Sequence, residues 1–404
     1  MTAAETPAPV LGQARATGIV AAGMMVMNLL TYAFSLLCAR VLGPRDFGAL
    51  TALLGVMIVA NVAALALQAT AARRLATTSP EHRDAVARDV IRNGWRVAVV
   101  LAVLLLATAP LLDRLLHLDD WVTACAPAVV MAPLTLMGAY AGLLQGNRRW
   151  VPLAVVYSSM GAGRVVAGAI AVLVDPSLRS AMIGIAIGAF APALAGALAC
   201  RVKRSSEPRE DHQPVLGELW TNGHTLLALF AFTNLDVLLA RHLLDEHEAG
   251  IYAAGAILAK ACLFLPTFVL VVAFPTMATE RGGRPWLRPL LAVGFLGVLA
   301  VLGALLLPGL AVAFAGGSAY ADLGDVAWLF AVEGTMFACL QILVYDTIAA
   351  QSHSGFLLWI GAVLVLVVAL VAVDSVLALV TLVAVVALGV ALVTGLMPGA
   401  SDPD

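Results

Sequence analysis

Four ionisable residues lie inside long apolar runs of the sequence. Arg164 stands in "SSMGAGRVVAGA", Asp236 in "NLDVLLA", Lys260 in "GAILAKAC" and Glu333 in "FAVEGTMF". A charge inside an apolar helix is costly unless it is paired or hydrated, so such residues commonly face a polar cavity. The two cations indicate a site for an anionic ligand, and the two acids indicate either ion coupling or a structural Asp236–Lys260 pair.

Two further arginines occupy similar charged corners, each directly after an apolar run. Arg40 lies in "CARVLGPRDFG" and Arg241, 201 positions later, lies in "LARHLLDEHEAG". Each has an alanine before it and a leucine two residues after it, and a glycine (Gly48 or Gly250) follows within nine residues. The two arginines either line the same cavity as Arg164 and Lys260 or anchor helix ends at the membrane surface. The echo itself indicates an internal duplication.

The elements that carry these residues are predicted to be transmembrane helices. Hydrophobic residues make up 62% of the 404 positions, charged residues only 12%, and the mean hydropathy is +0.97. A bilayer core of about 30 Å needs about 20 apolar residues per helix. The runs are continuous and too long for strands. We therefore expect an all-α polytopic membrane protein with twelve spans, at about 17–39, 47–70, 96–112, 121–143, 151–174, 179–200, 223–242, 249–276, 288–307, 323–347, 355–373 and 375–397.

The duplication divides these spans into two six-helix lobes. Residues 1–200 form the first lobe, residues 201–222 a polar linker, and residues 223–404 the second lobe. Because six is even, both copies enter the membrane from the same face, which predicts parallel repeats about an axis along the membrane normal.

The distribution of basic residues predicts the orientation. Loops on the side of the N-terminus hold 16 Lys and Arg residues, whereas loops on the other side hold 5. The positive-inside rule then places both termini in the cytoplasm. The basic connection 73–95 is expected to form a surface helix with Ser79 as its N-cap, Pro80 at its first position and Gly94 at its end.

Enzymatic motifs are missing from the sequence. It has no GxxxxGK[ST] phosphate-binding loop and no hydrolase or metalloprotease signature. Its five cysteines form no CxxC pair. We expect no enzymatic activity, no cofactor, no metal and no nucleic-acid partner, so an ion gradient or the membrane potential would drive any transport.

Three stretches resemble a known family. "ARVLGPRDFGALTALL", "GLLQGNRRW" and "NLDVLLARHLLDEHEAGIYAAGAILAKACLFLPTFVLVVAFP" are similar to the polysaccharide-biosynthesis proteins of the multidrug/oligosaccharidyl-lipid/polysaccharide (MOP) exporter superfamily. The resemblance implies two lobes in a V around a central cavity, and alternating access that moves a lipid-linked oligosaccharide from the cytoplasmic to the outer leaflet of the cytoplasmic (inner) membrane. Twelve spans resemble the O-antigen-type flippases more than the peptidoglycan-precursor flippase, which has more.

The resemblance also implies partners and roles. The ligand would be a glycan linked to an undecaprenyl-type lipid pyrophosphate, and membrane proteins of the same pathway would be further partners. Arg164, Lys260, Arg40 and Arg241 are then candidates for binding the pyrophosphate, and Asp236 and Glu333 for ion coupling or pairing. Two alternatives stay open. One is an ion-coupled drug or small-molecule antiporter of the same architecture, and the other is a membrane enzyme or scaffold in a polysaccharide pathway.

Overall fold

A computed structural model describes residues 10–118, 120–200, 215–263, 286–349 and 355–396. These residues form helices and turns without any strand, which confirms the all-α prediction. Two short 3-10 helices cover Pro80–His82 and Ser318–Tyr320. The α-helices are α1 (Val10–Ala60), α2 (Val62–Thr77), α3 (Arg83–Leu116), α4 (Trp121–Gly146), α5 (Trp150–Val174), α6 (Leu178–Gly188), α7 (Phe190–Ala199), α8 (Val215–Leu243), α9 (Glu246–Cys262), α11 (Leu287–Leu306), α12 (Pro308–Ala315), α13 (Leu323–Ala349), α14 (Phe356–Ala372) and α15 (Val376–Leu396).

The helices coincide with the predicted spans. Within the described ranges, nine helical segments are long and apolar enough to cross a bilayer, and the first of them, Gly18–Ala76, contains two predicted spans. The shorter α14 matches the eleventh span, and α9 covers the first part of the eighth. The rest of that span, residues 264–276, lies outside the described residues, as does most of the predicted linker. Because α8 already begins at Val215, helix occupies the end of the stretch that was expected to be linker.

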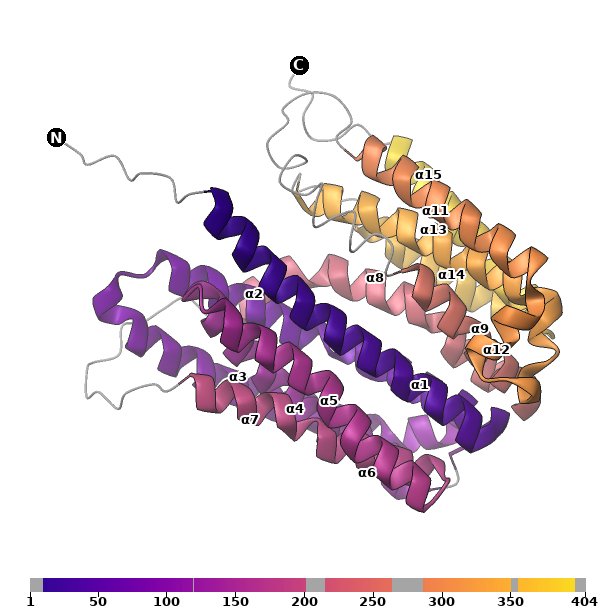
Figure 1. Ribbon diagram of the computed structural model, residues 1–404, viewed down its shortest axis with the longest axis horizontal. Helices are drawn as coiled ribbons and strands as arrows, with labels where there is room; N and C mark the ends of the chain where they lie inside the picture. Colours follow the sequence, from indigo (N-terminus) through magenta and orange to yellow (C-terminus); the bar gives the residue numbers. More distant parts are fainter. Residues whose placement is uncertain (1–9, 119, 201–214, 264–285, 350–354, 397–404) are drawn as a thin grey trace.

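A single glycine reverses the chain between the first two spans. Gly43 has φ +74° and ψ 172°, a conformation outside the helix that residues with a Cβ rarely adopt. Pro44 follows and starts the return. The chain therefore runs the length of the lobe to Gly43 and comes back to α2 (Figure 1). This turn is the first of the two charged corners.

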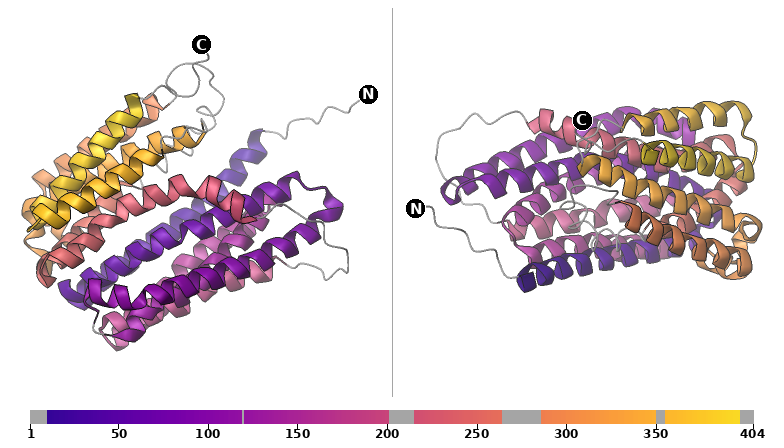
Figure 2. Two further views of the ribbon diagram at one scale, coloured as in Figure 1. Left: turned by 180° about the vertical axis from the view of Figure 1, so that it is seen from behind. Right: turned by 90° about the horizontal axis from the view of Figure 1, so that it is seen from above.

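The helices form two groups that meet at one end. Helices α1–α7 pack together, α8–α15 form the second group, and α1 crosses between them by packing on α5, α8 and α9. The two lobes diverge toward the side where the chain begins and where α2 joins α3, here called the terminus side (Figures 1 and 2). They converge at the opposite end, here called the corner side, where α8 turns into α9. Gly43 belongs to this side because the adjacent Pro44 packs against Gly250 of α9.

The outer surface of both lobes is apolar. Large hydrophobic side chains are exposed along α5, α11 and α14 and along α3 from Trp95 onward. Apolar exposure of this kind needs a lipid environment, because a water-soluble protein rarely exposes such continuous apolar surface. The polar residues are instead gathered between the lobes and at the two membrane faces.

Candidate functional site

A small chamber lies between the lobes and contains two of the predicted site residues. It has a volume of about 250 Å³, and both lobes contribute to its wall. Arg164 comes from α5 of the first lobe and Lys260 from α9 of the second. The other polar lining residues are neutral amides and hydroxyls. The full lining is Met27, Asn28, Thr31, Ser35, Phe47, Thr51, Leu54, Met57, Ile58, Asn61, Leu134, Met160, Arg164, Phe230, Ala256, Ile257 and Lys260.

The charge of the chamber is one-sided. Two cations and no carboxylate are among its described lining residues. The neutral polar groups include two amides, Asn28 and Asn61, whose NH₂ groups can donate to oxygen. A low-dielectric wall strengthens the field of both cations. The arrangement favours a small anionic group bound between the two lobes.

Arg164 carries a charge that has no counterion among the residues that the structure describes. Its half-buried guanidinium makes no hydrogen bond or ion pair with any described residue, and the Cys38 thiol is its electrostatic neighbour. A buried cation held without a partner is costly. The planar guanidinium is also the group that suits a phosphate or pyrophosphate best, since it donates two parallel hydrogen bonds.

Lys260 lies between the chamber and a buried acidic cluster. It interacts electrostatically with both Asp236 and Glu333 but forms no ion pair or hydrogen bond with them. The structure therefore brings the three residues into one region without the direct Asp236–Lys260 contact expected of a structural pair. A lysine in this position can turn its ammonium group toward either the acids or the chamber.

The acidic cluster is built around a tyrosine. Tyr252 Oη lies 3.2 Å from Asp236 Oδ2 and 3.4 Å from Glu333 Oε1, and all three residues are buried. The remaining oxygens, Asp236 Oδ1 and Glu333 Oε2, have no hydrogen-bond partner in the described structure. A phenol has only one hydrogen to donate. Two carboxylates that share it repel each other unless a proton or a cation joins them.

Arg40 and Arg241 lie on the corner side, where each binds backbone carbonyls of the opposite lobe. Arg40 of α1 is exposed and donates to the Ala313 carbonyl of α12 at 3.3 Å. Arg241 of α8 is 4% exposed and donates to the carbonyls of Leu116, at 2.8 Å, and His117, at 3.3 Å. Neither arginine lines the chamber. The structure thus unites Arg164 with Lys260 and places the other two predicted cations at a contact between the lobes.

The two echoing sequences form this contact, here called the corner contact (residues 39–48 and 241–250 with Tyr320). Arg45 Nε lies 3.0 Å from Glu246 Oε1, and Gly250 packs against Pro44. The buried Tyr320 donates to the Ala39 carbonyl at 2.8 Å and stacks edge-on against Phe47. Tyr252 and Tyr320 were not predicted as site residues. A tyrosine in an apolar run is usually a core residue, and only the structure shows the hydrogen bonds of these two hydroxyl groups.

Comparisons with known proteins agree with this architecture. A family model described as "Polysaccharide biosynthesis protein" matches residues 14–279. Solved structures with a similar fold include the lipid II flippase MurJ in an inward closed conformation, with a TM-score of 0.73, 11% identity, and coverage of 92% of this chain and 85% of that one. An inward-facing multidrug resistance MATE family transporter of the MOP superfamily has a TM-score of 0.71 at 12% identity, with coverage of 92% and 93%.

A MOP superfamily transporter from Pyrococcus furiosus, whose binding pocket is described as having reverse polarity, has a TM-score of 0.61 at 14% identity, with coverage of 94% of each chain. No functionally curated protein matches the sequence. The family match covers more than half of the chain, and the structural matches share its two-lobe helical fold. The chain belongs to the polysaccharide biosynthesis protein family and has the fold of the MOP superfamily transporters.

Proposed function

We propose that the protein is a transporter that moves a lipid-linked oligosaccharide or polysaccharide precursor across the membrane by alternating access. One observation carries the proposal: Arg164 and Lys260 reach one chamber from opposite lobes, with no carboxylate among its described lining residues. A pyrophosphate that bridges the lipid and the glycan has the charge and geometry that these cations favour. A chamber of about 250 Å³ is in the size range of such a head group and too small for a whole glycan.

The direction of transport follows from charge. Loops on the terminus side hold most of the Lys and Arg residues, so in our proposal this side faces the cytoplasm of the inner membrane. The lobes diverge there and meet at the corner contact. The described state is then one in which the substrate enters from the cytoplasmic leaflet. Opening of the corner contact would expose the chamber to the outer leaflet.

Coupling to an ion rests on the acidic cluster. When Asp236 and Glu333 are both charged, they attract Lys260 away from the chamber. When a proton or a cation occupies the cluster, Lys260 is free to bind the substrate anion. Binding of that ion on one side of the membrane and its release on the other would shift the equilibrium between the conformations open to the two sides. Such a shift couples transport to the ion gradient. The protein needs no catalytic chemistry of its own in this scheme.

A transport assay tests the proposal. The full chain is reconstituted into vesicles with a polyprenyl-pyrophosphate-linked oligosaccharide in the inner leaflet, and appearance of the sugar on the outside is followed by periodate oxidation. We expect protein-dependent exposure that Arg164→Ala abolishes and Arg179→Ala, an exposed arginine of the same lobe, leaves intact. Proton-coupled export of organic cations without any movement of the lipid-linked sugar would instead favour the small-molecule antiporter.

A further inference from the structure

A long apolar groove lies on the opposite side of α1 from the chamber. It has a volume of about 830 Å³, and its walls come from α1 and α2, from α3 and from α8. Along α3 the lining runs from Val97 to Leu115, which at 1.5 Å per residue is about 27 Å, close to the thickness of a bilayer core. The lining is almost entirely aliphatic, with His224 near the terminus side. Its length and chemistry match an extended hydrocarbon chain.

The groove and the chamber share their separating helices. Neighbouring residues on opposite faces of α1 line the two spaces, with Val56 and Val59 in the groove and Met57 and Ile58 in the chamber. On α8, Ala231 lines the groove and Phe230 lines the chamber. The two spaces therefore lie one helix apart, at the contact between α8 and the helices α1 and α2. A molecule with an apolar tail and a polar head can occupy both across this contact.

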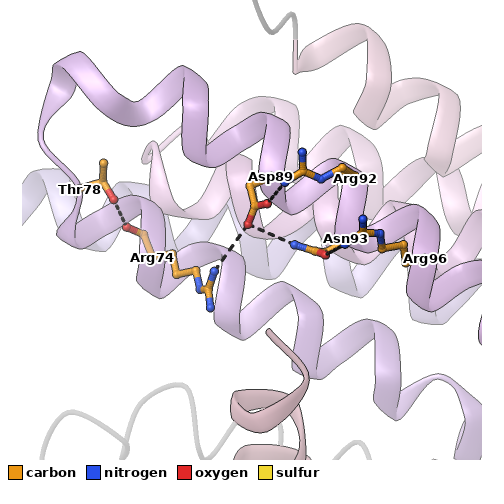
Figure 3. Close-up of polar contacts among 6 residues, drawn as sticks. All are labelled: Arg74, Thr78, Asp89, Arg92, Asn93 and Arg96. Carbon is orange, nitrogen blue, oxygen red and sulfur yellow. Dashed lines mark hydrogen bonds and ion pairs between the residues drawn. The ribbon is translucent and has the colours of Figure 1, made fainter. Parts of the chain in front are cut away.

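The terminus-side end of the groove carries a cluster of arginines held in place by one acid (Figure 3). Asp89 of α3 binds Arg92, accepts a hydrogen bond from Asn93 at 3.1 Å, and lies 3.8 Å from Arg74 of α2. Arg96 donates to the Asn93 side-chain oxygen at 3.3 Å. Asn93 lies one helical turn before Val97, where the groove begins on α3. This bond holds the Arg96 guanidinium at the mouth of the groove.

The cluster has a surplus of positive charge at the depth of lipid head groups. Arg74 and Arg92 contact the Asp89 carboxylate, whereas Arg96 contacts the neutral Asn93, and Arg92 and Arg96 are both exposed. The adjacent Trp95 is 54% exposed, and exposed tryptophans on membrane helices sit at the boundary between head groups and hydrocarbon. Arg92 and Arg96 are one turn apart, so they present two guanidinium groups together. Such a pair matches a diphosphate better than the single charge of a phosphodiester.

From this placement we propose that the groove binds the polyisoprenoid tail of the lipid-linked substrate, while Arg92 and Arg96 bind its pyrophosphate at the entrance. The inference rests on the proposed function and adds the entry site to it. The head group then passes between α8 and the helices α1 and α2 into the chamber, and the tail stays in lipid-like surroundings throughout. Arg164 and Lys260 take over the pyrophosphate from the arginines of the entrance.

Photocrosslinking tests the site directly. The full chain in nanodiscs is labelled with a polyprenyl pyrophosphate that carries a diazirine in its isoprenoid chain, and the adducts are located by mass spectrometry. We expect adducts on the groove-lining residues of α3 and α8. Val100→Trp fills the groove and should reduce labelling about tenfold, whereas Val103→Trp should not. The two valines are equally exposed, at 58% and 59%, on the same helix, and only Val100 lines the groove.

The head-group contact has its own pair of variants. Arg96→Gln should weaken labelling about tenfold, as expected for the loss of a charge-assisted hydrogen bond. Arg114→Gln, an exposed arginine at the other end of α3, should leave labelling unchanged. Excess phosphatidylglycerol should not compete. Full competition by that lipid would mean that the groove holds any anionic phospholipid and would overturn the proposal, as would equal losses in the Val100 and Val103 variants.

Different results would contradict the proposed entry site and the proposed transport function. Arg164→Ala should stop transport while groove labelling persists. If vesicles transport the lipid-linked sugar but the probe labels no groove residue, the entry site is wrong and the proposed function stands. If the probe labels the groove specifically but no transport occurs, the entry site stands and the proposed function is wrong.

Discussion

Arg45 Nε lies 3.0 Å from Glu246 Oε1, and this ion pair joins the two charged corners of the sequence across the two lobes. One arginine of each corner also donates a hydrogen bond to a carbonyl of the other lobe: Arg40 to that of Ala313 and Arg241 to that of Leu116. The two corners, which resemble each other in sequence, are therefore partners in one contact between the lobes. In the proposed transport cycle this contact has to open, so its strength should influence how readily the lobes separate.

Reversing one charge at the corner contact should favour the separated state. Both side chains of the Arg45–Glu246 pair are half exposed, so the pair contributes only about 0–1 kcal/mol. Arg45→Glu places two acids together, whereas the double exchange Arg45→Glu with Glu246→Arg restores attraction. Distances between spin labels on Arg179 and Asp322, replaced by cysteine in a cysteine-free background, should lengthen in the single variant and return in the double. Unchanged distances in the single variant would show that the pair has no influence on the lobes.

Filling the space at Gly250 should have a larger effect. A side chain there would overlap Pro44 of the other lobe, including its backbone, and backbone contacts cannot yield as a flexible side chain can. Gly250→Val should therefore force the corner contact open and increase the same spin-label distance. Gly294→Val in α11, which has no atom near its Cβ position, is the control. A closed corner in the Gly250 variant would contradict the packing described.

The two corner arginines should differ in their contribution to stability. Arg241 is buried and makes two hydrogen bonds to the last carbonyls of α3, so Arg241→Gln should cost about 2–4 kcal/mol. Arg40 is exposed and makes one long bond, so Arg40→Gln should cost at most about 1 kcal/mol. Thermal unfolding of the purified variants in detergent checks the order. Equal losses would mean that the burial of Arg241 brings no additional stability.

The cap of α4 predicts acid sensitivity. Burial alone would raise the pKa of Asp120, but hydrogen bonds from the Thr123 hydroxyl and from the backbone N–H groups of Thr123 and Val122 outweigh it and hold the pKa below its ordinary value. A lowered folded-state pKa stabilises the fold above the unfolded value, about 3.9, and this contribution disappears as pH falls through the folded-state pKa. Wild type should exceed Asp120→Asn in melting temperature at pH 6, and the difference should shrink progressively as pH falls below about 4. A difference as large at pH 3 as at pH 6 would exclude this origin.

Variants of Lys260 and Asp236 should distinguish a substrate-binding role of Lys260 from a purely structural one. Lys260→Ala alone leaves Asp236 and Glu333 without a nearby cation, so the variant should lose stability and transport together. Adding Asp236→Asn removes the repulsion between the acids and should restore stability. Transport should stay low in the double variant because the chamber still lacks the Lys260 charge and keeps only that of Arg164. Recovery of transport together with stability would show that Lys260 serves only to balance the acids.

The spans were predictable because helix length and continuous hydrophobicity are local properties. The inter-lobe meeting of Arg164 and Lys260 was only partly predictable. A charged side chain inside a membrane span costs free energy unless it is paired or hydrated, so both residues were predicted to face a cavity. No sequence feature, however, gives the distance between the two helices that carry them. Arg40 and Arg241 also follow apolar runs, but each donates hydrogen bonds to carbonyls of the opposite lobe. The sequence does not show which distant carbonyls will lie next to these arginines. The surface helix expected in the connection 73–95 starts after Ser79 as predicted, but it does not end at Gly94. Helix α3 instead continues without a break into the third span, up to Leu116.

Binding of an anionic head group by the chamber can be measured by one affinity comparison. Wild type in nanodiscs should bind a polyprenyl-pyrophosphate-linked sugar more tightly than the same sugar on an uncharged polyprenyl ether. In Arg164→Ala this preference should fall about 10- to 100-fold, as expected when one or two charge-assisted hydrogen bonds are lost. Arg164→Lys should keep part of the preference, since the charge survives and the two-pronged geometry does not. An unchanged preference in correctly folded Arg164→Ala would contradict binding of the pyrophosphate by Arg164 in the chamber.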